Sequence, residues 1–563
     1  MRPATVSRLT TAVAALVCAL LALQPATARA ASYTKISGGG STWSSNALDQ
    51  WRRNVAANSG MTVNYSPVGS SVGREQFKNG TADFAVSEIP YGLTESGMRD
   101  APPKRGYAYM PIVAGGTAFM YNLRIGGRKV TNLRLSGEVI TKIFTGTLTM
   151  WNAPEIRADN PGLVLPARRI IPVVRSDGSG TTAQLTTWLA KEHSGLWDAY
   201  CRRAGRSTPC GMTSYFPVVP GSSTIAKSGS LGVSGYTKQG HAEGAITYVE
   251  YSYAIKTGFP VAKVLNASGY YVEPTASSVA VALMKARINE DKNSENYLTQ
   301  ILDGVYRSAD RRTYPLSSYS YMIVPTKAES PFTTAKGKTL GSFANYFLCE
   351  GQQQAEELGY SPLPKNLVEA GFTQVRRIPG APSADIDIKS CRNPTFSSDG
   401  SNTLARNAPY PKACDKRGTT QCADGTAGAK QQTRVNSGAD GGGSGGGTGG
   451  TGGTGAAGGK GGAGTAGASG GSTGTDGASG AATGGGAASG AVDPDTGEPV
   501  EGSAGGGDAS VVGNPVTLAA GGSPGLRGVL MALSAVLLLG VVVGPPLTAR
   551  ALAARNRRKE GPR

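Results

Sequence analysis

Three segments of this sequence place glycines and hydroxyl side chains where a predicted β-strand gives way to a predicted helix. They are Gly38-Gly-Gly-Ser-Thr-Trp43, Gly69-Ser-Ser-Val-Gly73 and Arg175-Ser-Asp-Gly-Ser-Gly-Thr-Thr182. The first N–H groups of a helix have no partner within the helix and lie at the positive end of its dipole, and glycines let an anion approach them. The three segments therefore predict a site that holds an oxyanion with N–H and O–H donors.

The third segment carries the most donors. Arg175 offers a fixed fork of N–H groups that fits an oxyanion, and Asp177 would orient this guanidinium. Ser179 and Thr181 add hydroxyls, and the N–H groups of Gly180 and Thr181 come at the helix start. One Gly-Ser-Thr turn alone often does no more than cap a helix. Three such turns in one chain, one of them with an Arg-x-Asp pair, favour a ligand site.

The residues that catalysis or metal binding would need are scarce. Ser179 does not lie in a G-x-S-x-G nucleophile elbow. A Ser-His-Asp triad would have to recruit His193 or His241, and His193 follows Ser179 on the same predicted helical stretch. With two histidines and no C-x-x-C pair, a zinc site is not expected. We therefore predict no catalytic residues, no metal and no cofactor.

Predicted strands and helices alternate along the part of the chain that carries these segments. Apolar, β-branched runs predict strands over 62–65, 84–86, 108–113, 118–121, 170–174 and 319–324. Amphipathic spacing predicts helices over 43–55, 74–78, 136–144, 181–191, 277–288, 333–347 and 366–375. This alternation is typical of an α/β fold with largely parallel sheets, which binds ligands beyond the carboxyl ends of its strands. The length of the region favours two lobes.

The two ends of the chain predict export and a membrane anchor. Residues 1–31 resemble a secretory signal peptide, with a basic start, an apolar run and a small-x-small cleavage site at 28–30. The alternative, an uncleaved anchor, is disfavoured because the run is short for a bilayer span. Residues 526–549 contain an uncharged stretch long enough to cross a bilayer as a helix. The basic tail 550–563 would then be cytoplasmic, with the large N-terminal part outside the cell.

Glycine and cysteine content separates a predicted linker from the cysteine-containing folded part of the chain. Residues 424–525 are rich in Gly, Ala, Ser and Thr and are predicted to be a disordered linker, because they hold too little apolar surface for a core. Cys18 lies in the signal segment, and the other six of the seven cysteines are expected to form disulfides outside the cell. These six are Cys201, Cys210, Cys349, Cys391, Cys414 and Cys422. Local spacing favours Cys201–Cys210 and suits Cys414–Cys422, although other pairings stay open. Residues 391–423 are interpreted as a cysteine-containing extension of the folded domain.

The charge of the chain excludes one class of partner. Its formal net charge of +18 suits an anionic ligand or surface, and it equally suits plain solubility. The sequence has no dense Lys/Arg run interleaved with aromatics, so we predict no nucleic-acid partner.

Further motifs accompany the three segments. They are Ala82-Asp-Phe-Ala-Val-Ser-Glu88, Phe144-Thr-Gly146 with Trp151-Asn152, Gly244-Ala-Ile-Thr-Tyr-Val-Glu-Tyr251 and Leu358-Gly-Tyr-Ser-Pro-Leu-Pro364. In this order, over residues 32–379, the set resembles the phosphate-binding proteins of the high-affinity phosphate ABC transporter, the PstS family. The resemblance implies an α/β periplasmic-binding-protein fold (type II) over residues 32–390. In this fold two lobes, joined by hinge strands, close on the ligand.

The resemblance also implies which residues would hold phosphate. They match the family's motifs and offer N–H, hydroxyl, guanidinium or carboxylate groups: Thr42, Trp43, Ser70, Glu88, Arg175, Ser179, Gly180 and Thr181. Asp177 would orient Arg175. In the family an Asp at the position of Glu88 accepts a hydrogen bond from protonated phosphate and so excludes sulfate. Glu88 moves the carboxylate by roughly 1.5 Å, which leaves the identity of the oxyanion open. The alternative is that Glu88 is only a surface carboxylate.

The function we expect is that of a membrane-tethered extracellular protein. It would capture inorganic phosphate between two lobes and deliver it to the permease subunits of an ABC transporter. One alternative is a tethered receptor or sensor for phosphate or another oxyanion, without a transport role. A less favoured alternative is an extracellular phosphatase on the same scaffold, since histidines and metal ligands are scarce.

Overall fold

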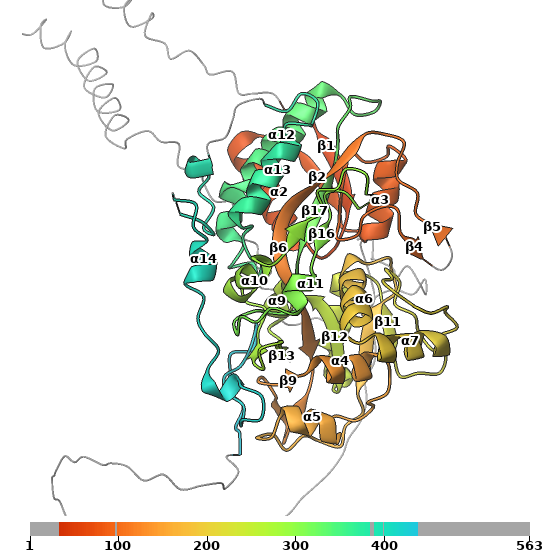
Figure 1. Ribbon diagram of the computed structural model, residues 1–563, viewed down its shortest axis with the longest axis vertical. Helices are drawn as coiled ribbons and strands as arrows, with labels where there is room; N and C mark the ends of the chain where they lie inside the picture. The colour runs from red at the N-terminus through yellow and green to blue at the C-terminus, as the bar shows by residue number, and fades with distance from the viewer. Residues whose placement is uncertain (1–32, 96–97, 295, 383–387, 398, 437–563) are drawn as a thin grey trace, which may run out of the picture. The chain divides into compact units, whose positions relative to one another are not determined.

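The computed structural model describes residues 33–95, 98–294, 296–382, 388–397 and 399–436 (Figure 1). The expected signal segment (1–31), membrane span (526–549) and basic tail (550–563) lie outside the described residues, as does the expected linker beyond residue 436. Among the helices of the described ranges, none is both long enough and apolar enough to cross a bilayer.

One mixed sheet of eleven strands organises the described residues. Its strands follow the order β11-β10-β12-β6-β17-β3-β1-β2, and β13 joins β14 and β9 to β6. Their bounds are β1 Ile36–Gly40, β2 Val63–Ser66, β3 Phe84–Ser87, β6 Tyr107–Tyr121, β9 Arg134–Leu135, β10 Ile171–Arg175, β11 Ile225–Lys227, β12 Ala245–Glu250, β13 Val261–Leu265, β14 Tyr271–Val272 and β17 Ser317–Pro325. Short hairpins are formed by β4 Thr94–Glu95 with β5 Met98–Arg99, β7 Arg124–Ile125 with β8 Arg128–Lys129, and β15 Arg287–Ile288 with β16 Gln300–Ile301.

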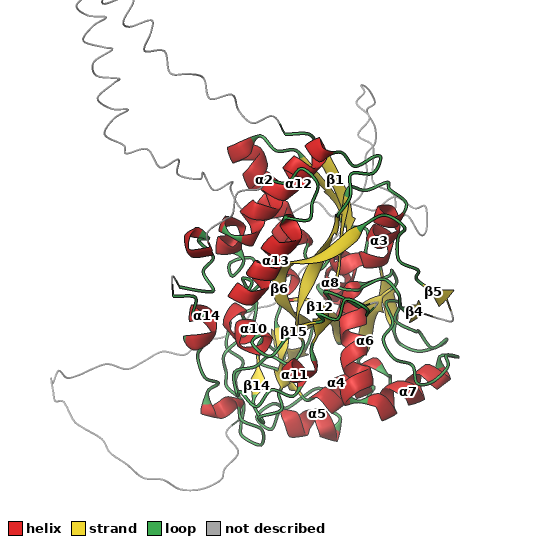
Figure 2. Ribbon diagram, turned by 45° about the horizontal axis from the view of Figure 1, so that its top comes forward, coloured by secondary structure: helices red, strands yellow, loops and turns green. Residues whose placement is uncertain are grey.

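Helices surround the strands of both lobes (Figure 2). Lobe 1 contains β1, β2, β3, β17 and the first part of β6, with α2 Ser45–Ser59, α3 Ser70–Lys78, α12 Thr334–Leu348 and α13 Lys365–Val375. Lobe 2 contains β10 to β13 and the last part of β6, with α4 Gly137–Phe144, α5 Pro154–Asp159, α6 Gly180–Glu192, α7 Ser194–Arg203, α8 Gly229–Thr237 and α9 Tyr251–Thr257. The remaining helices are α10 Ala276–Leu283, α11 Asp303–Tyr306 and α14 Thr403–Arg406. The expected two-lobed α/β fold is therefore confirmed.

The sheet is less parallel than the sequence predicts. Parallel pairing links β1 with β2 and β3, and β10 with β11 and β12. In contrast, β6 runs antiparallel to β12 and β17, and β17 runs antiparallel to β3. The carboxyl ends of the parallel strands therefore lie at one edge of the sheet within each lobe. Strands β6 and β17 lie between the parallel strands of lobe 1 and those of lobe 2.

The long strand β6 joins the two lobes. Residues 107–116 of β6 pair with β17 in lobe 1, and residues 117–121 pair with β12 in lobe 2. The prediction of two separate strands over 108–113 and 118–121 is wrong, because Gly115 and Gly116 do not break the strand. Instead they allow close packing: a Cβ atom on Gly115 would lie 2.8 Å from Cη2 of Trp43, and one on Gly116 would lie 2.5 Å from Cβ of Pro274.

Helix α2 shows how an amphipathic pattern becomes a packed element. Its apolar stripe is buried, and the Trp51 ring stacks on Phe347 of α12 with a centroid distance of 5.1 Å. The Trp51 indole N–H donates to the Gly351 carbonyl at 2.7 Å, so its one polar group is satisfied. The helix ends at Gly60, whose φ of 66° is in the left-handed region that glycine favours.

Residues 388–397 and 399–436, which we call the C-terminal strap, pack on both lobes. A disulfide between Cys349 and Cys391 joins the strap to lobe 1 just after α12. In lobe 2, Arg134 donates to the carbonyls of Cys414 and Thr419 at 2.9 and 2.7 Å, and Lys263 pairs with Asp415 at 2.7 Å. The predicted Cys201–Cys210 and Cys414–Cys422 disulfides are both confirmed.

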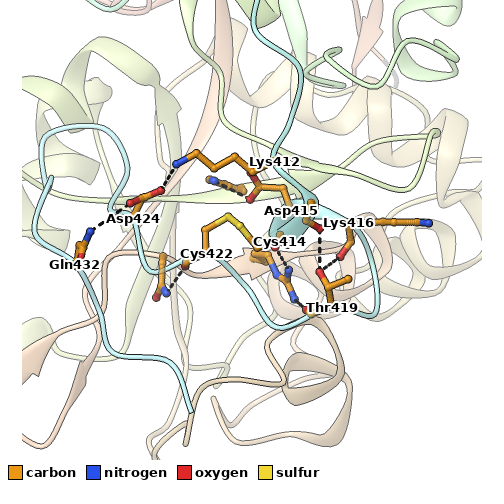
Figure 3. Close-up of a disulfide and its surroundings, with 12 residues drawn as sticks. Lys412, Cys414, Asp415, Lys416, Thr419, Cys422, Asp424 and Gln432 are labelled. Atoms are coloured by element: carbon orange, nitrogen blue, oxygen red, sulfur yellow. Dashed lines mark hydrogen bonds and ion pairs between the residues drawn. A yellow bond between two sulfur atoms is a disulfide. The ribbon is translucent and has the colours of Figure 1, made fainter. Parts of the chain in front are cut away.

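The packed chain extends beyond the boundary at 423 that the composition suggests. Figure 3 shows the loop closed by Cys414 and Cys422, with Lys412 paired to Asp424 at 2.5 Å. Further on, Thr426 is buried and exchanges hydrogen bonds with the backbone of Val261 at 2.6 and 3.0 Å. Small residues can follow the lobe surface closely here, so a glycine- and alanine-rich composition does not mark the end of the packed region.

Candidate oxyanion site

The three segments that the sequence singles out meet between the two lobes. The Ser71 N–H, at the start of α3, donates to the Gly178 carbonyl in the turn before α6 at 3.2 Å. A Cβ atom on Gly69 would lie 2.8 Å from an oxygen of Asp177, so only glycine allows this approach. From the first segment, the Thr42 hydroxyl lies 2.8 Å from the Ser230 hydroxyl of α8. Segments far apart in the chain thus form one cluster of donors.

Arg175 lies at the end of β10 and is fixed by Asp177. The Arg175 Nε donates to Asp177 Oδ1 at 2.7 Å, and Nη2 donates to Oδ2. Asp177 Oδ1 also accepts the Gly229 N–H at 2.9 Å. Burial raises the pKa of the Asp177 carboxyl, but the hydrogen bond and charge of Arg175, with the Gly229 N–H, together outweigh it and lower the pKa. The two hydrogen bonds to Asp177 therefore hold the Arg175 guanidinium in a single orientation.

The start of α6 supplies donors next to this pair. The Ser179 hydroxyl accepts the Thr182 N–H at 3.2 Å and caps the helix. The Gly180 N–H donates to the Ser70 hydroxyl of lobe 1 at 3.1 Å. The Thr181 hydroxyl is buried and finds no hydrogen-bond partner in the part of the chain that the structure describes. A buried hydroxyl of this kind is available to a bound oxyanion.

Glu88 lies inside this cluster, directly after β3. It is 2% exposed, so the alternative of a surface carboxylate is wrong. Its Oε2 accepts the hydroxyls of Ser41 at 2.8 Å and Ser70 at 3.0 Å, and its Oε1 accepts the hydroxyl of Ser320. Burial raises the pKa of Glu88, and the three serine hydroxyls act in the opposite direction without cancelling the increase.

The first segment closes the lobe 1 side of the site. The Trp43 N–H donates to the Ser41 hydroxyl at 3.0 Å, and the Trp43 carbonyl accepts the Tyr360 hydroxyl at 2.6 Å. The Trp43 ring is fully buried and makes an edge contact with Tyr360. These contacts fix the turn before α2 and leave the Thr42 hydroxyl facing α8, where the Ser230 N–H donates to it at 3.2 Å.

A cavity of about 420 Å³ adjoins the cluster. It extends along α6 and is lined from both lobes, by Glu88 and Tyr321 of lobe 1, by Gln184 and Lys191 of α6, and by the β16 hairpin. The Gln184 side chain donates to the Glu88 carbonyl at 3.0 Å, which fixes one end of the cavity. Among the described residues, no group of three or more His, Cys, Asp and Glu side chains is arranged to hold a metal ion.

Sequence reasoning missed the side chains that support the predicted donors. Ser41 lies within the first motif, and Ser230 follows Gly229 at a helix start, so both carried a local signal. Ser320 and Gln184 carried none, since one lies inside a β-strand and the other inside a helix. Their contacts with Glu88 depend on how the strands and lobes pack.

Two lobes joined by a crossing strand, with oxyanion donors between them, define a periplasmic-type binding protein. The family model of a PBP superfamily domain matches residues 25–350, more than half of the chain. The phosphate-binding protein PstS of Xylella fastidiosa (strain Temecula1) is 31% identical over 345 residues, which is 61% of this chain and 86% of the relative. PstS 2 of Mycobacterium tuberculosis (strain H37Rv) is 31% identical over 332 residues, 58% of this chain and 82% of the relative.

The chain therefore belongs to the PBP superfamily and, within it, to the PstS family. A solved structure of a high-affinity periplasmic phosphate-binding protein, PfluDING, is 18% identical, covers 63% of this chain and all of the other, and superposes with a TM-score of 0.46.

Proposed function

We propose that this protein captures inorganic phosphate between its two lobes and delivers it to the permease subunits of an ABC transporter. The Arg175–Asp177 pair is the observation that carries the proposal, since it presents a fixed, buried guanidinium next to the donors of α6. Relatives named as phosphate-binding proteins, at 31% identity, support phosphate as the anion.

The ligand shell combines eight residues from both lobes with complementary roles. Lobe 1 contributes Thr42, Trp43, Ser70 and Glu88, and lobe 2 contributes Arg175, Ser179, Gly180 and Thr181, with Asp177 orienting the guanidinium. All but one of these groups donate hydrogen bonds or positive charge to an anion. Glu88 can only accept while it is ionised, so it favours an oxyanion that carries a proton. At neutral pH phosphate meets this condition, and sulfate does not.

Calorimetry on the purified full-length protein tests this function. After bound ligand has been removed, phosphate should bind saturably, and sulfate should give no heat of binding. Binding of both anions would overturn the selectivity argument, and binding of neither would overturn phosphate as the ligand. A phosphatase assay on the same sample should show no turnover, because we propose a binding protein and not an enzyme.

The cellular setting is also a proposal. We infer that the binding domain lies outside the cell, attached through the part of the predicted linker that follows the packed strap, residues 437–525, and a single helix at 526–549. Capture of the tagged full-length chain from membranes should bring down permease subunits. Recovery of the full-length chain in the soluble fraction, away from membranes, would favour a free binding protein. Phosphate binding without capture of a permease would favour a sensor.

A further inference from the structure

We propose that Ser320, on strand β17, is a positioning residue that holds the Glu88 carboxylate in place for oxyanion recognition. This inference rests on the proposed function for its consequence, although the contact itself can be tested without ligand. Ser320 belongs to none of the motifs that surround the site, and it lies 232 residues from Glu88 in the chain.

The sheet register brings the two residues together. Strands β17 and β3 are antiparallel, with Tyr321 opposite Ser87 and Met322 opposite Val86. One step further along this register, Ser320 faces Glu88. Residues that face each other in an antiparallel pair project on the same side of the sheet. The Ser320 hydroxyl accordingly donates to Glu88 Oε1, while both side chains are buried.

A β-bulge lies at the same point, on the other side of β17. Ser320 is opposite Val113 of β6, but Tyr321 is opposite Pro111, so β6 carries Ile112 as an extra residue. Proline has no N–H for the ladder, and bulges are among the places where a sheet tolerates it. The Ile112 carbonyl accepts the side-chain amide of Gln352 at 2.9 Å. Bulges often re-aim side chains next to functional sites, and here the serine at the bulge points at the carboxylate.

The division of donors shows what Ser320 contributes. Ser41 and Ser70 both donate to Oε2, and each also accepts a backbone N–H from a turn that precedes or begins a helix, Trp43 or Gly180. These two contacts leave Oε1 to Ser320. The Ser320 contact therefore fixes the rotation of the carboxylate, and with it the direction in which Oε2 faces the Gly180 turn.

A double-mutant cycle on the full-length protein tests this. Ser320→Ala should weaken phosphate binding by about tenfold, as expected for loss of a hydrogen bond to a charged group, and should narrow the preference for phosphate over sulfate. Ser320→Thr, which keeps the hydroxyl, should restore most of the affinity. In a Glu88→Asp background the carboxylate is drawn back by roughly 1.5 Å, so the added Ser320→Ala change should alter binding less than twofold.

Ser318→Ala is the matched control. Ser318 lies two residues earlier on the same face of β17 and is buried, and its hydroxyl has no hydrogen-bond partner among the described residues. It should bind phosphate like the unaltered protein. The proposal would be overturned by equal effects of Ser318→Ala and Ser320→Ala. It would also be overturned if Ser320→Ala weakened binding as much in the Glu88→Asp background as it does with Glu88 intact.

A ligand-free measurement separates this proposal from the proposed function. The ¹³C chemical shift of the Glu88 carboxyl, followed against pH without phosphate, reports its pKa. Ser320 lowers this pKa in the folded protein, so Ser320→Ala should raise it and Ser318→Ala should not. The titratable groups that interact electrostatically with Glu88 are Tyr65, Tyr321 and Tyr360. Burial raises the pKa values of all three phenols above the usual tyrosine value, so they stay neutral while the Glu88 carboxyl titrates. An unchanged Glu88 pKa would overturn the positioning role, whereas absent phosphate binding would overturn only the ligand.

Discussion

Asp177 holds the guanidinium of Arg175 through two hydrogen bonds, with Nε 2.7 Å from Oδ1 and Nη2 donating to Oδ2. The two residues are separated by a single position in the chain, yet Asp177 also accepts the Gly229 N–H from α8. The pair thus links the turn before α6 to the start of a second helix, and the remaining guanidinium nitrogen, Nη1, donates to the Ser230 hydroxyl of α8 at 3.4 Å.

Removing the guanidinium should abolish phosphate binding. Arg175→Ala deletes the one cationic side chain among the predicted ligand residues, and charge-assisted hydrogen bonds are the strongest kind available here. We expect phosphate affinity to fall at least a hundredfold in calorimetry. Retention of affinity within tenfold would show that the anion lies elsewhere.

Asp177→Asn should show its effect in the pH dependence of stability. The pKa of Asp177 is lowered in the folded protein. The ionised carboxylate therefore contributes to the free energy of unfolding above its unfolded pKa of about 3.9, and this contribution is lost as the pH falls through the lowered folded value. Without phosphate, the variant should therefore have a lower Tm than the unaltered protein at pH 7 and a smaller deficit at pH 3. A deficit independent of pH would contradict the pairing.

Glu88→Gln should show the opposite pH dependence. Burial raises the pKa of Glu88 against the effect of its hydroxyl partners. The favourable contribution of the protonated group is complete below the unfolded pKa of about 4.3 and is lost as the pH rises through the folded value. Scanning calorimetry without ligand should compare the Tm of Glu88→Gln with that of the unaltered protein at each pH. The difference, variant minus unaltered protein, should be more positive at pH 7 than at pH 4.

The same variant tests selectivity. A glutamine at this position can donate as well as accept, so a fully ionised anion is no longer repelled. We expect Glu88→Gln to bind sulfate measurably while it keeps phosphate binding. Continued exclusion of sulfate would show that a different group makes the discrimination.

Gly180→Ala should damage the site through space alone. A Cβ atom at this position would lie 1.8 Å from Glu88 Oε2 and 2.7 Å from the Ser70 hydroxyl. We expect at least a hundredfold loss of phosphate affinity and a lower Tm. Gly195→Ala in α7 is the control, because nothing lies within 4 Å of its Cβ position; it should bind normally. Normal binding by Gly180→Ala would contradict the close packing of Glu88 on α6.

Removing the disulfide between lobe 1 and the strap should lower stability. Cys349 and Cys391 are 42 positions apart, and a cross-link over such a loop contributes about 2–4 kcal/mol, mainly by restricting the unfolded chain. The double change Cys349→Ser with Cys391→Ser should reduce the free energy of unfolding in urea by this order. The change Cys414→Ser with Cys422→Ser, which opens a loop of separation 8, should cost less. A reversed order would show that the strap is held chiefly by its other contacts.

The features predicted correctly from sequence are local. Strand, glycine turn and helix start follow each other within a few residues in the segments around Thr42, Ser70 and Gly180, so their donors could be recognised without any tertiary information. The same is true of the Arg175–Asp177 pair and of the two disulfides with short loops. The sequence predicts two strands, 108–113 and 118–121, where the structure has the single strand β6. Gly115 and Gly116 do not resolve this, because a glycine pair is equally compatible with a break in a strand and with close packing of a continuous one.

From the order of residues alone one can therefore predict N–H and hydroxyl donors at the starts of several helices. Three features depend on the folded arrangement: how these donors meet, the position of Glu88 among three serines, and the path of the strap over lobe 2 past Cys422. These features escape a local pattern because sheet register and lobe packing connect residues such as Glu88 and Ser320, which are 232 positions apart. Such contacts are fixed by the burial of the whole sheet, and no local pattern of residues encodes them.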